Sequence, residues 1–146
     1  MRSRATGLVP AGAVTLAVAL AGCGGSSGPS DKQQIETTLT TYYKAFSRGD
    51  SAGACQELSA ATRATLERAG RGKGCSQILD AALKRPDYAA VATKLAGAQV
   101  TQVTVGGDKA TAVVVVPGVK VSGGHGARRS VPLIKEHGAW KIAAGQ

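Results

Sequence analysis

The chain has 146 residues, which suits one domain with a single hydrophobic core and is short for two. Eighteen basic and nine acidic residues give it a formal net charge of +9, and the basic residues are scattered along the chain. A nucleic-acid-binding domain usually gathers basic and aromatic side chains on one face, so this scatter and an aromatic content of 3% argue against nucleic acid as a partner. We interpret the excess charge as solvated surface, with attraction to anionic lipid head groups or acidic polymers as the alternative.

The first 22 residues have the pattern of a secretory signal peptide. Arg2 and Arg4 form a basic start, no charged residue occurs from Ala5 to Gly22, and small residues gather at the end of this run. Glycine, proline and threonine dilute the apolar stretch, so it is weaker than a segment that must remain in the bilayer. A retained transmembrane anchor is the alternative.

The signal ends in "LAGC", residues 20–23, which resembles the lipobox of bacterial lipoproteins: an aliphatic residue, two small residues and then a cysteine. The resemblance implies cleavage after Gly22, acyl chains such as palmitate on Cys23, and attachment to the extracytoplasmic face of a cell membrane. Two or more acyl chains would give the stable anchoring that one chain does not. Residues 23–30 are then the lipidated cysteine and a flexible tether, and residues 31–146 form the folded domain.

Two other cysteines, Cys55 and Cys75, remain once Cys23 is set aside. In an exported chain an even pair predicts a disulfide. The alternative, a catalytic thiol, needs a base, and the two histidines, His125 and His137, lie in glycine-flanked turns far along the chain. No set of cysteine, histidine and carboxylate residues has the spacing of a metal site, so neither a metal nor another cofactor is expected.

The domain is predicted to begin with helices. Ser30 and Gln33 have the spacing of a capping box, and the apolar residues that follow have helical spacing up to about Arg48, where Gly49 ends the helix.

Further helices are predicted after this first one. Asp50 can cap a second helix that carries Cys55 and Leu58, and Ser59 can restart the chain into one or two more turns. The remaining segments are a loop over 69–74, a third helix over 75–83 ended by Pro86, and an ambiguous short helix over 88–95.

From Ala98 the period of the pattern changes to that of strands. A turn at 106–108 predicts a hairpin, and a second hairpin over 128–144 turns at His137 and Gly138. The continuous run Val113–Val116 suits a strand covered on much of both faces, or one whose outer valines meet a partner. Residues 122–127 are predicted to form a mobile loop, and Pro132 predicts an unpaired position at an edge or a bulge.

Helices followed by an antiparallel meander predict an α+β fold with the N-terminal helices packed on one face of a curved antiparallel sheet. The stretches "IETTLTTYYKAFSRGDSAGACQELS", "VGGDKATAVVVV" and "VPLIKEHGAWKI" resemble the NTF2-like superfamily, which includes SnoaL-type cyclases and ketosteroid isomerase. The resemblance covers residues 31–146 and implies a cone whose mouth can bind small apolar ligands. No extra strand is apparent between the second and third helices, so a smaller sheet than in the larger relatives is expected.

Five aromatic residues are candidates to line such a pocket, with plain core packing as the alternative: Tyr42, Tyr43, Phe46, Tyr88 and Trp140. We expect Trp140 to close against the same core as the inward-facing tyrosine of helix one. Enzymes with this fold place an acidic residue inside the cone for proton transfer. Here Asp108 and Glu136 lie beside predicted turns, and the helical carboxylates are read as solvent-facing, so no catalytic residue is assigned.

The sequence therefore favours a non-catalytic, membrane-anchored lipoprotein that binds a small apolar ligand or an envelope protein. The alternatives are an isomerase- or cyclase-like enzyme of the SnoaL and ketosteroid isomerase type, and a structural module of an envelope transport or secretion assembly. The structural module predicts an exposed valine face or edge at Val113–Val116.

Overall fold

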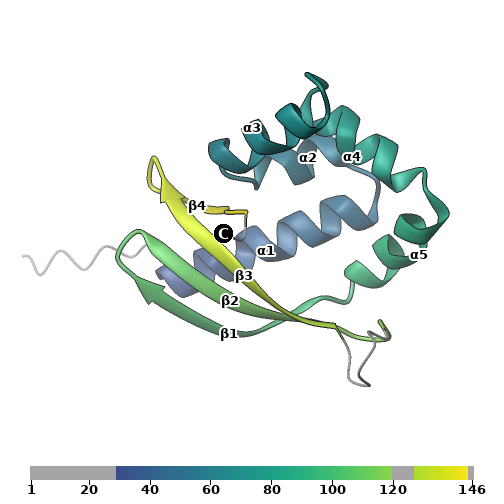
Figure 1. Cartoon of the computed structure of the whole chain (residues 1–146). Coiled ribbons are helices and arrows are strands. Elements are labelled where there is room, and N and C mark those ends of the chain that lie inside the picture. The colour runs from purple at the N-terminus through teal and green to yellow at the C-terminus, as the bar shows by residue number, and fades with distance from the viewer. Residues whose placement is uncertain (1–28, 120–126, 145–146) are drawn as a thin grey trace, which may run out of the picture.

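A computed structural model of the chain describes residues 29–119 and 127–144. The predicted signal peptide and Cys23 lie outside the described residues. The helices are α1 (Asp31–Ser47), α2 (Ser51–Gln56), α3 (Ala60–Ala69), α4 (Cys75–Leu83) and α5 (Pro86–Leu95). The strands are β1 (Gln99–Gly106), β2 (Lys109–Val116), β3 (Ala127–Glu136) and β4 (Ala139–Ile142), and they form one antiparallel sheet in the order β1-β2-β3-β4. The predicted α+β class is therefore correct: helices are followed by an antiparallel meander, and α1 lies along one face of the sheet (Figure 1).

Helix α1 begins and ends where its capping residues predict. The Ser30 hydroxyl accepts a hydrogen bond from the backbone N–H of Gln33, whose side chain accepts one from the backbone N–H of Ser30 in return. After the last turn Gly49 takes a positive φ of 76°, a conformation that glycine adopts without steric cost. Ile35 and Leu39, one turn apart, are completely buried and face the sheet and the other helices.

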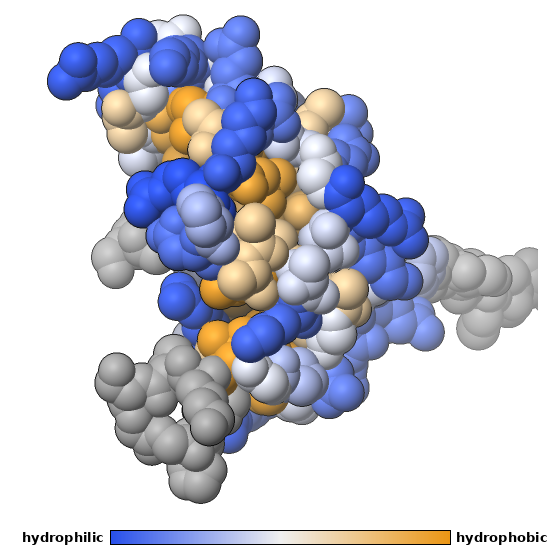
Figure 2. Space-filling model, turned by 90° about the vertical axis from the view of Figure 1, so that its right-hand side faces the viewer, coloured by the Kyte–Doolittle hydropathy of each residue, from blue (hydrophilic) through white to orange (hydrophobic). Residues whose placement is uncertain are grey.

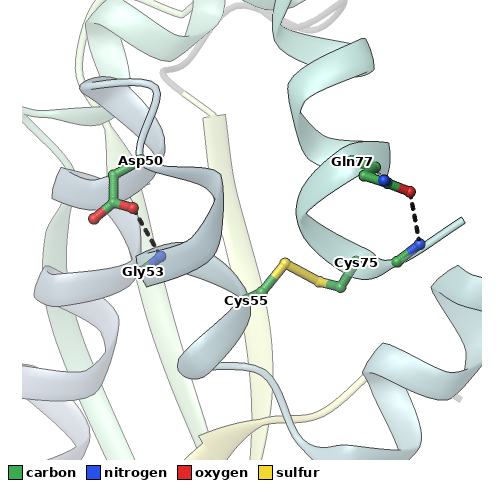
Figure 3. Close-up of a disulfide and its surroundings, with 6 residues drawn as sticks. Asp50, Gly53, Cys55, Cys75 and Gln77 are labelled. Atoms are coloured by element: carbon green, nitrogen blue, oxygen red, sulfur yellow. Dashed lines mark hydrogen bonds between the residues drawn. A yellow bond between two sulfur atoms is a disulfide. The ribbon is translucent and has the colours of Figure 1, made fainter.

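A disulfide joins Cys55 of α2 to Cys75 at the start of α4, as the even pair predicted (Figure 3). Each cysteine belongs to a helix whose first turn is held by a side-chain hydrogen bond. At α2 the Asp50 carboxylate accepts from the Gly53 N–H at 2.8 Å, and at α4 the Gln77 side chain accepts from the Gly74 N–H at 3.2 Å. The bond closes a loop with a sequence separation of 20, which stabilises a fold by roughly 3 kcal/mol through the unfolded state. That loop contains α3, in which no residue is buried, so the cross-link fixes a segment that has little core of its own.

Two helices differ from their predicted extents. Helix α3 has 10 residues rather than one or two turns. Its start is held by the Ser59 hydroxyl, which caps it, and by the Glu136 carboxylate, which accepts from the Ala60 N–H at 3.1 Å. Pro86 begins α5 at the first helical position, where its missing N–H costs nothing, so the short helix starts before residue 88.

In the sheet, one face packs on the helices and the other is half covered. Val114 and Val116 are buried toward the helices, and Val113 and Val115 alternate with them on the opposite face, half-buried. The valine run is thus fully covered on one face and partly covered on the other. Residues 122–126 of the predicted mobile loop lie outside the described residues, and Ala127 already belongs to β3.

Pro132 lies in β3, which is an interior strand, and its pairing with Thr111 of β2 shows no bulge, so the bulge alternative is wrong. The predicted unpaired position lies instead on the side of β4, at a local edge. The Pro132 carbonyl accepts from the Ala143 N–H at 2.9 Å, which places the ring nitrogen on the same side, next to the point where β4 ends at Ile142. A short fourth strand leaves β3 with a local edge there.

The outer edge of β4 is closed by the segment between α2 and α3. Leu58 forms a parallel bridge with Ile142, the Ile142 N–H donates to the Glu57 carbonyl at 2.8 Å, and the Ser59 N–H donates to the Ile142 carbonyl at 2.9 Å. Glu57 is one of the helical carboxylates expected to face solvent, and this expectation is wrong. Its side chain lies 3.6 Å from Lys141, and only 19% of it is exposed. These bonds tie the helical layer to the end of the sheet.

Trp140 is fixed at the start of α1. Its Nε1–H donates to the Asp31 carboxylate at 2.9 Å, and the Lys135 ammonium donates to the same oxygen at 2.7 Å. The indole is only 1% exposed, so this hydrogen bond satisfies its one polar group. The hydrogen bond from Lys135, and then that from Trp140, hold the pKa of the Asp31 carboxyl below its usual value of 3.8.

This arrangement predicts a pH-dependent contribution of Asp31 to stability. A carboxyl with a lowered folded-state pKa stabilises the fold above its unfolded pKa, and that contribution is lost as the pH falls through the folded-state value. The substitution Asp31→Asn should therefore lower the urea midpoint at neutral pH, and the difference from wild type should shrink below about pH 4. Glu67→Gln, the same loss of charge on exposed α3, is the control; equal effects of the two variants would contradict the assignment.

Candidate functional site

A cleft of about 400 Å³ lies between the C-terminal half of α1, helix α5 and the adjoining ends of β2 and β3. Figure 2 shows the right-hand side of Figure 1, with hydrophobic surface in hollows between polar rims. The size is within the range of pockets for small molecules. The lining side chains are mostly apolar or aromatic, with a single charged residue among the described ones: Tyr42, Tyr43, Phe46, Tyr88, Val91, Leu95, Val114, Val116, Val119, Ala127 and Arg129.

The α1 wall is a cluster of three aromatic rings. Tyr42 and Phe46 are four residues apart, on one face of the helix, with ring centroids 6.1 Å apart. Tyr43 lies edge-on to Tyr42 at 5.2 Å. Phe46 is buried, whereas the two tyrosines are half-buried, because their rings pack on the core and also border the cleft. This wall therefore combines apolar aromatic rings with two hydroxyl groups.

The α5 wall is apolar and exposed. Tyr88, Val91 and Leu95 follow helical spacing along the side of α5 that borders the cleft, and Ala92 is the one buried residue of the helix. Tyr88 is 45% exposed and Val91 is 40% exposed, and both are among the exposed large hydrophobic residues of the described chain. Large apolar side chains that remain in contact with water inside a cleft favour the binding of an apolar molecule.

The floor comes from neighbouring strands. Val114 of β2 pairs with Arg129 of β3, and Val116 pairs with Ala127, so these four residues share the face that looks toward the helices. The small Ala127 leaves room where a larger side chain would fill the cleft.

Burial changes the chemistry of the two tyrosines. Loss of hydration raises the pKa of Tyr42 to about 12, because the phenolate is the form that burial disfavours. Burial also raises the pKa of Tyr43, and the nearby positive charge of Arg129 opposes part of that rise. Both hydroxyls are therefore uncharged at neutral pH.

The sequence identified four of the aromatic residues that line the cleft, and it was wrong about Trp140. Tyr42, Tyr43, Phe46 and Tyr88 meet there, although they come from two separate helices. Trp140 is not among the lining residues, because its bond to Asp31 places it in the core at the other end of α1. The expectation that Trp140 closes against the same core as a tyrosine of α1 is correct, because Tyr42 and Tyr43 pack against the core cluster that contains Trp140.

Sequence reasoning missed Val91, Leu95 and Arg129. The first two could have been found from their spacing with Tyr88. Arg129 could have been found from the alternation of side chains along a strand. It is four residues from Leu133, which is buried, so the two share a face of β3, whereas Arg128 lies on the opposite face.

No carboxylate lines the cleft. All nine aspartate and glutamate residues of the chain lie within the described residues, and none is a lining residue. Within residues 29–119 and 127–144 there is also no cluster of three residues that could hold a metal ion. Over the same residues, no helix is long and apolar enough to cross a membrane.

Comparisons with known proteins were made for the whole chain. No family model matches it, and no curated protein matches it. Among solved structures, it is similar to a protein from Campylobacter jejuni described as a "Putative NTF2-like transpeptidase", with 14% sequence identity and a TM-score of 0.49, over 80% of this chain and 100% of that one. A likeness of this degree supports no argument about activity, so the function is inferred from the cleft.

The raised pKa of Tyr42 predicts a loss of stability in alkali. Above pH 10 the tyrosine ionises in the unfolded chain but stays neutral in the folded one until about pH 12, so unfolding becomes more favourable in that interval. Tyr42→Phe should therefore retain more of its stability on going from about pH 9 to about pH 11, by roughly 1 kcal/mol in urea unfolding. Tyr88→Phe, on the exposed wall, is the control; the assignment fails if both variants follow wild type.

Proposed function

We propose that the chain is a non-catalytic lipoprotein whose NTF2-like domain binds a small apolar ligand in the aromatic cleft. The observation that carries this proposal is the α5 wall, where Tyr88 and Val91 expose large apolar surfaces inside a cleft of about 400 Å³. Filling the cleft would remove those surfaces from water, which stabilises a complex by about 25 cal/mol per Å² of apolar area buried before the costs of association.

The absence of a carboxylate from the cleft favours binding over catalysis. An isomerase or cyclase of the ketosteroid isomerase type needs a general base next to the substrate, and none of the nine carboxylates lines the cleft. Asp108 and Glu136 are placed beside the hairpin turns, as expected, with Glu136 bonded to the start of α3. Burial raises the pKa of each tyrosine hydroxyl, so both stay protonated at neutral pH and neither supplies a phenolate to act as the base.

The structural-module alternative has less support. It needs an exposed valine surface, but Val114 and Val116 are buried, and Val113 and Val115 are half-buried. Their cross-strand neighbours on that face are the polar residues Ser130 and Arg128. The face is mixed in character, unlike the contiguous apolar patches that mark protein interfaces.

The proposed anchor and the cleft belong to opposite ends of α1. Ser30 caps the start of α1, where Asp31 bonds to Lys135 of the β3–β4 hairpin, while the cleft lies at the C-terminal half of α1. The 17-residue helix is about 25 Å long. A domain anchored through Cys23 would thus hold its cleft on the side away from the attachment point, where a soluble ligand or carrier can reach it.

The anchor is tested by Cys23→Ala in the full-length chain. Wild type should be recovered from the membrane with a mature N-terminus at Cys23 that carries acyl chains, as read by mass spectrometry, and the variant should carry none. Any variant chain that has lost its signal should be released from the membrane. Ser26→Ala in the tether is the control and should behave as wild type; retention of a processed Cys23→Ala chain on membranes contradicts the proposal.

Ligand binding is tested with the uncharged fluorophore N-phenyl-1-naphthylamine and the mature chain, residues 23–146, made unlipidated by Cys23→Ala. The fluorophore should brighten on binding, and Val91→Gln should weaken its binding several-fold because the substitution places a polar amide in the α5 wall. Val105→Gln is the matched control, because Val105 is also 40% exposed but lies on β1 outside the cleft. No brightening with wild type, or equal loss in both variants, would overturn the proposal.

A further inference from the structure

Arg129 is a solvent-exposed cation whose place in β3 puts it on the same face of the sheet as buried residues. It pairs with Val114, which is buried, so it lies on the face of β3 that looks toward the helices. The preceding residue, Arg128, pairs with Val115 on the opposite face. Of these adjacent arginines, only Arg129 lines the cleft, where every other described lining residue is uncharged.

Within residues 29–119 and 127–144, the guanidinium of Arg129 has no anionic partner. All nine carboxylate side chains lie in the described part of the chain, and the four salt bridges found there use Lys32, Arg85, Lys135 and Lys141. Arg129 also makes no side-chain hydrogen bond with another described residue. An arginine beside an apolar cleft, without a counter-ion, presents a planar fork of donors that matches a carboxylate.

Among the described residues at the cleft, no other side chain competes for that role or opposes it. Tyr43, which is close enough to feel the charge of Arg129, is uncharged at neutral pH and so does not repel an anion. Lys94 at the edge of α5 already donates to the Gly118 carbonyl at 2.9 Å. Arg85 lies over the Tyr88 ring and is paired with Asp87. Of the cations that the structure describes at the cleft, one is left unpaired, which suits a ligand with a single negative charge.

We propose that the cleft binds an amphipathic carboxylate, with its hydrocarbon part between the α5 wall and the aromatic rings of α1 and its carboxylate on Arg129. This assignment rests on the proposed function, because it names the class of ligand for the same cleft. It adds a polar anchor that fixes the orientation of the ligand, which an apolar cleft alone does not do.

The test uses decanoate and decan-1-ol as competitors of the bound fluorophore at neutral pH, with the unlipidated mature chain. The two molecules share one alkyl chain and differ in charge. Arg129→Met keeps an apolar stem of similar length and removes the guanidinium, so it should weaken decanoate binding about tenfold while decan-1-ol binding changes less than twofold. Arg128→Met, which removes the same charge from the other face of β3, should leave both affinities within twofold of wild type.

The outcomes separate the two proposals. If neither competitor nor the fluorophore binds wild type, the proposed function fails and this inference fails with it. If decan-1-ol binds but decanoate does not, or if Arg129→Met and Arg128→Met weaken decanoate equally, the carboxylate assignment is overturned while the apolar cleft stands. Arg129→Lys, which keeps the charge without the fork, should lose part of the decanoate affinity, and unchanged decan-1-ol binding shows that each variant is folded.

Discussion

The packing of α1 along one face of the sheet is the constraint on which the remaining structure depends. Ile35 and Leu39 are completely covered, and the bond from Trp140 to Asp31 fixes where the helix begins. With its first turns held against the sheet, the helix can only direct Tyr42 and Phe46 toward the space beside α5. The same helix therefore supplies the core in its first half and a wall of the cleft in its second. A shift of one residue in its packing would remove both.

Local signals in the sequence predicted most of the elements correctly. Ser30, Asp50 and Ser59 begin helices because each side chain satisfies a backbone N–H close to it in the chain, and that chemistry can be recognised without the fold. The place of Trp140 could not be predicted in this way. Its partner Asp31 is 109 residues away, and the contact exists only once β4 has paired with β3 and α1 has crossed the sheet.

The two arginines of β3 show the same limit at the candidate site. In the sequence, Arg128 and Arg129 form an adjacent basic pair, and both are naturally interpreted as solvated surface charge. Pairing of β3 with β2 separates them, because neighbouring residues of a strand point to opposite faces. The parity of Leu133 would have placed Arg129 inside, but only the position of α5 shows that the inside is a cleft at that point. The aromatic residues were easier to find because their side chains suit a pocket wherever they lie.

The two walls of the cleft differ in how much of each is buried in the core. The α1 wall is part of the core, whereas α5 buries a single residue, Ala92, and is joined to the turn after β2 by the bond from Lys94 to the Gly118 carbonyl. A tilt of α5 that brought Tyr88 and Val91 against the aromatic rings of α1 would close this space. In this chain those side chains stay exposed while the helix is held in place. A molecule bound between the walls would supply the apolar contacts that α5 lacks, so occupancy and the stability of α5 would rise together.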